Sequence, residues 1–129
     1  MTIGDGKATV RSYFEDFLNR GDLNAADAIF IPEARFHYPL GELIGVEAIK
    51  GYIVGFRAAF PDVRFTVEDL FGDGGRVAAR WRLTATQMGS FRDRPPTGKQ
   101  VTVNGNTIFR VQNARISEMW VAFDPAPFS

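Results

Sequence analysis

Hydrophobic residues in the first half of the chain recur with a helical period. Over residues 8–20 they fall on one face of a 3.6-residue repeat, and Gly21 is a suitable helix stop. A shorter repeat runs from Leu23 to Phe30 and ends at Pro32, because proline cannot continue a helix. A third repeat covers residues 46–60. These patterns predict three helices.

Beyond the third helix, hydrophobic and polar residues alternate with a period of two, which is typical of half-buried strands. The sequence Asp73-Gly74-Gly75 is a strong turn signal between the first two of these strands. The loop 92–98 is too rich in proline to pair in a central strand. The expected strands, one before the third helix and four after it, cover residues 34–38, 63–68, 77–84, 100–112 and 115–123.

The predicted order of elements is therefore α-α-β-α-β-β-β-β. Consecutive strands joined by short turns pair antiparallel, and three helices gathered on one face of such a sheet make an α+β domain. We predict a curved, mainly antiparallel sheet wrapped around three helices of the N-terminal half, a cone with an internal apolar pocket. At 129 residues the chain corresponds to a single domain, residues 1–129.

Composition narrows the classes of function. Fifteen basic and fifteen acidic side chains give no net charge, so no electrostatic argument favours nucleic acid or an anionic membrane. The chain has no cysteine and one histidine, which excludes disulfides, thiolate zinc sites and His-rich metal sites. It shows neither a membrane-spanning run nor a signal peptide, and we expect a cytoplasmic protein. Twelve phenylalanines indicate either tight packing or an aromatic pocket.

Short motifs spread over nearly the whole chain resemble those of one family. They lie at 19–23 (NRGDL), 45–49 (GVEAI), 60–62 (FPD), 76–81 (RVAARW), 96–99 (PTGK), 109–110 (FR) and in the Glu, Trp and Asp of 118–124. In this order they resemble the SnoaL-like polyketide cyclases, members of the cone-shaped superfamily of nuclear transport factor two and ketosteroid isomerase. The resemblance implies cyclase or isomerase chemistry on a small hydrophobic carbonyl compound, without a cofactor.

The usual acid and base of the family have no counterpart in this chain. The family's His position falls at Thr107 and its Asp position at Val121. If the turn at 113–114 allows pairs whose residue numbers sum to 228, these two residues lie opposite each other on one face of the sheet. Ketosteroid isomerase has its base where this chain has Tyr38, and its oxyanion donors where it has Phe14 and Thr107. Threonine and valine cannot transfer protons near neutral pH.

Three other side chains are candidate catalytic residues. Asp124 is the carboxylate nearest the expected cavity, or else it caps a turn before Pro125. His37 titrates near physiological pH, or else it is a structural residue that faces away from the cavity. Tyr38, and less so Tyr13, has a hydroxyl that can donate to a ligand carbonyl, or else packs as an ordinary aromatic.

Residues on the inward-facing positions of the strands and on the apolar faces of the helices are expected to line the pocket. Some of them are expected to be ordinary core residues that do not touch a ligand. The predicted ligand-binding residues are Phe14, Phe17, Phe56, Phe60, Trp81, Thr107, Phe109, Met119, Val121 and Phe123. Outward parity is shared by Arg80, Arg82, Ile108, Arg110, Glu118 and Trp120. A sheet face that carries Trp and Ile rarely stays exposed to water. The resembled family commonly dimerises through this face, and we therefore expect a homodimer.

Two functions remain open from the sequence. The first is a cofactor-independent cyclase or isomerase in which Tyr38 and Thr107 orient a carbonyl and Asp124 or His37 moves the proton. The second is a non-catalytic module that binds a small apolar ligand. The missing His and Asp favour the binding module, and the family resemblance favours the enzyme.

Overall fold

The strands form one sheet in the order β2-β1-β6-β5-β4-β3. The computed structural model describes residues 5–128. In chain order its elements are α1 (Asp5–Ser12), the π-helix η1 (Tyr13–Asn19), α2 (Leu23–Ile29), β1 (Phe30–Tyr38), β2 (Gly41–Ile44), α3 (Val46–Ala59), β3 (Arg64–Asp73), β4 (Arg76–Thr86), β5 (Gln100–Gln112), β6 (Arg115–Phe123) and the 3₁₀ turn η2 (Ala126–Phe128). The predicted α+β fold is confirmed.

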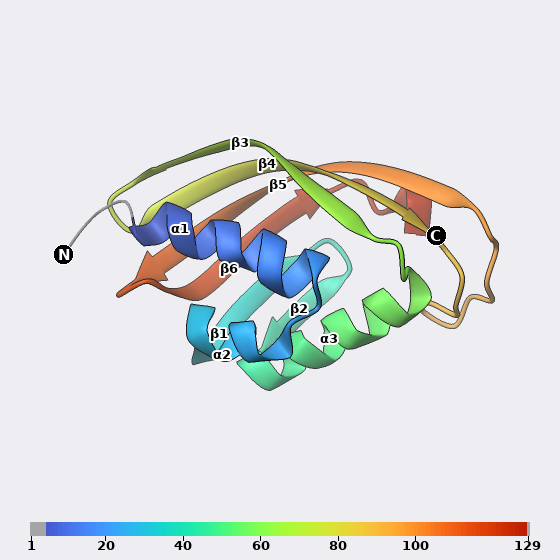
Figure 1. Ribbon diagram of the computed structural model, residues 1–129, viewed down its shortest axis with the longest axis horizontal. Coiled ribbons are helices and arrows are strands. Elements are labelled where there is room, and N and C mark those ends of the chain that lie inside the picture. Colours follow the sequence, from blue (N-terminus) through green and yellow to red (C-terminus); the bar gives the residue numbers. More distant parts are fainter. Residues whose placement is uncertain (1–4, 129) are drawn as a thin grey trace.

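The sheet is antiparallel except where β1 pairs in parallel with β6. Figure 1 shows β3, β4 and β5 arching over α1, with α2 and α3 on the same side of the sheet. The long strands therefore cover the helices from one side, and the apolar faces of both layers meet in the core. Thr107 and Val121 are direct partners across β5 and β6. The turn at 113–114 alone would place Trp120 opposite Thr107, and a register shift at Arg110 and Val111 moves the pairing by one residue.

The first helix extends through the region that its period predicts but changes its hydrogen bonding midway. Residues Tyr13–Asn19 form a π-helix, in which the N–H of Arg20 reaches the carbonyl of Glu15 at 3.2 Å. A π-turn carries an extra residue, so the inward face shifts by one position relative to an α-helix. The carbonyls left free at its end are satisfied from outside, since the Arg57 guanidinium donates to Leu18 at 2.8 Å.

The strands differ from the sequence prediction in several places, and β3 extends to Asp73, beyond the expected end at residue 68. The strand β1 begins at Phe30 and runs through Pro32, although proline lacks an N–H for the ladder. Pro32 is tolerated because it lies within the irregular stretch of the β1–β6 pairing, between Phe30 and Arg35. The expected loop at 39–45 contains the short edge strand β2, which pairs back onto β1.

Small residues shape the inner face of the sheet. Gly105 of β5 lies opposite Trp81 of β4, and the indole ring occupies the space that a side chain at 105 would take. This close approach is a known use of glycine in a strand. The Trp81 ring therefore lies over Gly105 on the face of the sheet and also contacts Phe65 and Phe123.

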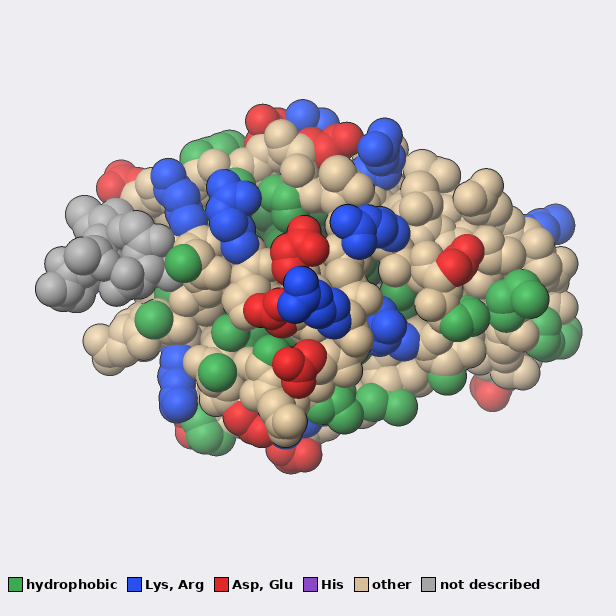
Figure 2. All heavy atoms as spheres, in the orientation of Figure 1, with side chains coloured by type: hydrophobic (Ala, Val, Ile, Leu, Met, Phe, Trp, Pro, Cys, Tyr) green, Lys and Arg blue, Asp and Glu red, His purple; other side chains and the backbone are tan. Residues whose placement is uncertain are grey.

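Charged side chains of both signs are intermingled on the face shown in Figure 2. That face therefore has no extended field of a single sign, of the kind that binds polyanions. Among the described residues, no helix has the length and apolarity that crossing a bilayer demands.

Candidate functional site

A cavity lies between η1, α3 and the concave face of the sheet. Its empty space is about 500 Å³ when counted out to solvent, and about 60 Å³ of this is wide enough for the centre of a water molecule. One water needs roughly 10–15 Å³ by the same measure, so the cavity has room for a small or flat guest. The residues that line it are Tyr13, Phe14, Leu18, Phe36, Tyr38, Tyr52, Ile53, Phe56, Phe65, Trp81, Thr107, Val121 and Phe123.

The polar atoms of this lining are hydroxyls and one indole N–H. The hydroxyls belong to Tyr13, Tyr38, Tyr52 and Thr107, and the N–H belongs to Trp81. None of the lining residues is a carboxylate, an amine or an imidazole. The cavity therefore offers neutral hydrogen bonds to a guest and no ordinary acid–base pair.

Thr107 and Trp81 are joined in the cavity wall. The Trp81 indole N–H donates to the Thr107 hydroxyl at 2.9 Å, and both residues are buried. A threonine hydroxyl that accepts one bond still has a proton to donate. Among the described residues no acceptor takes that proton. The Thr107 O–H is therefore available to an acceptor on a guest in the cavity.

Two tyrosines of the cavity, Tyr13 and Tyr52, are held in their protonated form. Burial raises the pKa of Tyr13 well above its usual range, and the nearby Tyr52 adds to the shift. Burial also raises the pKa of Tyr52, Tyr38 adds to that shift, and Arg92 opposes it. These mutual effects mean that the phenol groups lie near one another. At neutral pH, Tyr13 and Tyr52 are donors and not bases.

A groove lies on the outer surface beside the end of β1. The strand β1 ends at Tyr38, whereas its neighbour β6 continues to Phe123. The residues that line the groove are His37, Tyr38, Pro39, Trp120, Val121, Ala122 and Phe123. The groove and the cavity share Tyr38, Val121 and Phe123 in their linings.

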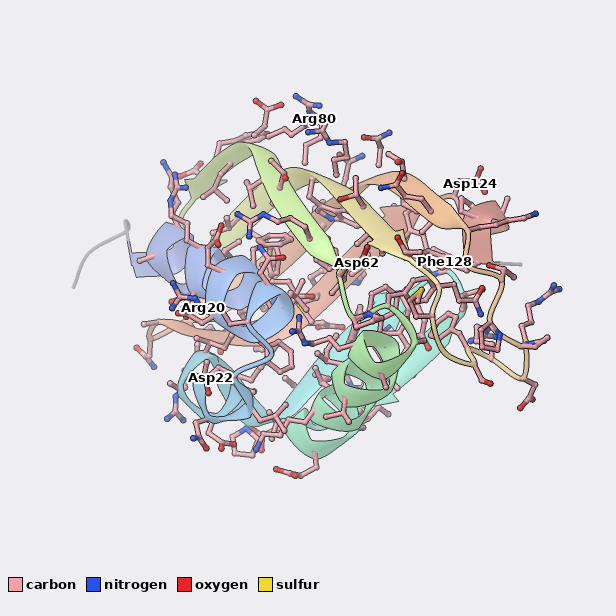
Figure 3. All side chains as sticks on the ribbon, turned by 45° about the vertical axis from the view of Figure 1, so that its right-hand side comes forward. Arg20, Asp22, Asp62, Arg80, Asp124 and Phe128 are labelled. Atoms are coloured by element: carbon pink, nitrogen blue, oxygen red, sulfur yellow. The ribbon has the colours of Figure 1, made fainter. Side chains whose placement is uncertain are left out.

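Asp124, proposed from the sequence as a catalytic carboxylate, lies outside the cavity lining. It is exposed, and its carboxylate accepts the backbone N–H of Ala126 at 3.0 Å. In Figure 3 it lies at the edge of the molecule, past the end of β6. Asp124 is therefore the turn cap. It comes directly after the end of β6 at Phe123, and its carboxylate accepts a backbone N–H of the turn that follows.

His37 also lies outside the cavity lining, on the outer face of the sheet. Its Nδ1 is 2.9 Å from Glu42 and its Nε2 is 2.6 Å from Glu118. Its ring stacks on Trp120 with centroids 5.9 Å apart. Alternation along β1 explains this, because Phe36 and Tyr38 point inward and the residue between them points outward.

The predicted ligand-binding residues separate into two groups. Those found in the lining are Phe14, Phe56, Trp81, Thr107, Val121 and Phe123. The others are not in the lining, and Phe17, Phe60, Phe109 and Met119 are fully buried core. Phe17 is displaced because the π-turn brings Leu18 to the cavity in its place.

Tyr52 is the main lining residue that the sequence analysis missed. It lies on α3 three residues after Ile49 and four before Phe56, on the same helical face. That spacing was a usable signal, but a tyrosine at the margin of an apolar stripe is as often a surface residue. Its ring contacts Tyr38 at 5.2 Å between centroids.

Known proteins share this architecture. A sequence profile of the SnoaL-like polyketide cyclases matches residues 8–128. A protein from Jannaschia sp. CCS1, provisionally named a SnoaL-like polyketide cyclase, superposes with a TM-score of 0.90 at 23% identity, over 99% of this chain and 92% of the other. AclR of Streptomyces galilaeus, provisionally named a hydroxylase, gives 0.83 at 24% identity, over 98% and 94%.

A third structure is somewhat closer in sequence. IdmH of Streptomyces antibioticus, provisionally named a polyketide cyclase, gives a TM-score of 0.81 at 28% identity, over 93% of this chain and 92% of IdmH. At 23% and 24% identity, the similarity to the first two structures supports only the shared fold. No curated protein matches the chain.

Proposed function

Because this chain belongs to the SnoaL-like polyketide cyclase family, we propose that it binds a small hydrophobic carbonyl compound in its cavity and promotes cyclisation or isomerisation of it without a cofactor. The observation that carries the proposal is the chemistry of the lining, an apolar cavity whose hydroxyls come from Tyr13, Tyr38, Tyr52 and Thr107. Such hydroxyls suit a carbonyl oxygen, which accepts hydrogen bonds and carries no charge.

The hydroxyls favour one kind of step, the formation of an enolate. When a C–H next to a carbonyl loses its proton, the electron pair moves onto the carbonyl oxygen. Donors such as the phenol of Tyr52 and the hydroxyl of Thr107 bind that oxygen more strongly as its charge develops. Removing one such donor from an enzyme typically lowers kcat by about 10²–10³-fold.

The proton acceptor is water in this proposal, since the lining contains no base. A methylene between two carbonyl groups is acidic enough to lose its proton to water when its enolate is stabilised. Closure of a ring then follows from holding the nucleophilic carbon and a second carbonyl of the same molecule in contact. The new C–C bond forms as the π bond of the second carbonyl breaks, and the resulting alkoxide takes back the proton that water accepted. The substrates that fit this site are therefore compounds with 1,3-dicarbonyl groups.

A second function, a non-catalytic binding module, is favoured by the same absence of acid–base residues from the lining. The two differ in one measurable property. An enzyme accelerates exchange of the activated methylene protons with solvent, whereas a binding module holds the compound and leaves their exchange unchanged.

The test uses 1-phenyl-1,3-butanedione as the probe, with binding measured by calorimetry and exchange of its methylene protons in D₂O followed by NMR. We expect binding with accelerated exchange, lost on Tyr52→Phe, which keeps the ring and removes one hydroxyl. Asp124→Asn, outside the cavity, is the matched control and retains both. Binding without accelerated exchange supports the module, and no binding of this probe refutes the enzymatic function.

A further inference from the structure

The end of the cavity nearest η2 is closed by a cluster of phenylalanine rings, which we name the phenylalanine plug. Its members come from segments far apart in the sequence: α3, the loop between β4 and β5, the end of β6, and η2. They are Phe56, Phe60, Phe91, Phe123 and Phe128. Neither Phe91 nor Phe128 belongs to any of the sequence motifs described above.

Phe128 is the centre of the phenylalanine plug. Its ring contacts every other member, with centroids 6.0 Å from Phe56, 5.7 Å from Phe60, 5.9 Å from Phe91 and 5.8 Å from Phe123. The side chain is buried, with 9% of the residue exposed. Figure 3 places it between η2 and the end of α3.

The phenylalanine plug has an inner and an outer layer relative to the cavity. Phe56 and Phe123 line the cavity, and Phe128 does not. Because Phe128 contacts both of them, it lies behind the wall and keeps the two rings in place. Packed interiors transmit such constraints, since a ring cannot shift without vacant space to move into.

The outer layer is held unequally. Phe91 belongs to a loop fastened by paired backbone hydrogen bonds with Arg94, at 3.0 and 2.9 Å, and by the side chain of Gln87, which donates to Gly89 and Pro95. Phe128 ends a single 3₁₀ turn, in which its N–H donates to Pro125 at 2.9 Å. The backbone of Phe128 is therefore held by fewer of these hydrogen bonds than the loop of Phe91.

From this arrangement we infer that Phe128 determines the length of the ligand that the cavity accepts. The inference rests on the proposed function only in taking the cavity as a binding site. Without the Phe128 ring, Phe56 or Phe123 can move outward and deepen the cavity. Each additional buried methylene of a ligand then raises the affinity by about fourfold.

The test compares the wild type with Phe128→Ala, using n-alkylbenzenes from ethylbenzene to n-hexylbenzene as probes and calorimetry or NMR titration as the measurement. We expect wild-type affinity to rise with chain length up to a limit and then to fall. In Phe128→Ala the limit moves up by about two methylenes, and the first probe beyond the wild-type limit binds at least about tenfold more tightly. Phe128→Leu, a milder truncation, is expected to move the limit less and serves if the alanine variant fails to fold.

Phe71→Ala is the matched control, because Phe71 lies on β3 with 64% of the residue exposed and takes no part in the plug. An unchanged limit in both Phe128 variants overturns the inference, as does failure of every probe to bind the wild type and all variants. The alkylbenzenes have no carbonyl group. A protein that binds them but not 1-phenyl-1,3-butanedione therefore refutes the proposed function and leaves this inference standing.

Discussion

The indole N–H of Trp81 donates a hydrogen bond of 2.9 Å to the hydroxyl of Thr107 in the wall of the cavity. The bond crosses the inner face of β4 and β5, and it is buried on both sides. It satisfies the one polar atom of the indole and leaves the threonine proton free for a guest. Thr107 thus has a structural partner in Trp81 and a remaining donor.

Replacing Thr107 with valine keeps the shape and removes the acceptor. We expect Thr107→Val to lower the free energy of unfolding by about 1–3 kcal/mol, because the Trp81 N–H is left buried without a partner. Urea unfolding measures this. Thr107→Ser retains the hydroxyl and is the control, with a smaller loss. Equal stability of the valine variant and the wild type would contradict the role given to this bond.

Gly105 and Gly55 offer a matched pair of substitutions with opposite expected signs. A Cβ at 105 would overlap the Trp81 ring, so Gly105→Ala should destabilise the fold by about 1–3 kcal/mol through overpacking. A Cβ at 55 meets nothing within 4 Å on α3, so Gly55→Ala should stabilise by about 0.5–1 kcal/mol. Thermal unfolding of both variants gives the signs, and a stabilising Gly105→Ala would refute the packing described.

Alkaline pH should destabilise the fold through Tyr13 and Tyr52. Burial raises the pKa of both above the ordinary value of 10.0, so the unfolded chain ionises first as pH rises. Their contribution to stability is complete below pH 10.0 and is lost as pH rises from there toward the native pKa values.

The measurement is urea unfolding across this range, with phenolate absorbance recorded in parallel. Native protein should show the Tyr13 and Tyr52 phenolates only at a pH well above 10.0, or on unfolding. Tyr13→Phe/Tyr52→Phe should have a flatter alkaline stability profile than the wild type. Identical profiles for the two proteins would show that these phenols titrate normally.

We propose that the outer face of the sheet joins two copies of the chain. Ile108 is 46% exposed there, and Trp120 lies beside it on β6 with the guanidinium of Arg110 5.3 Å from its ring centre. The face also carries carboxylates of Glu68 and Glu118, so a second copy can meet opposite charges. Sedimentation velocity should show a dimer, and Ile108→Asp should shift it to monomer. A monomeric wild type at all concentrations would refute the interface.

The periodicity of the sequence was enough to predict most elements and the turn between the last two strands. Both turn residues, Asn113 and Ala114, have positive φ, 52° and 62°, as a two-residue hairpin requires. This turn alone would place Trp120 opposite Thr107. A β-bulge between the turn and Thr107 moves the register by one residue, and Val121 becomes the partner of Thr107.

The order of residues was therefore sufficient to predict the α+β class and the antiparallel hairpin of the last two strands. The choice of hydrophobic side chains that face the cavity came instead from packing in three dimensions. In the π-helix η1, Leu18 lines the cavity and Phe17 does not. Tyr52 of α3 also lines it, and Phe128 of η2 packs behind Phe123. These outcomes depend on contacts between segments distant in the chain, and no local period encodes how such segments converge.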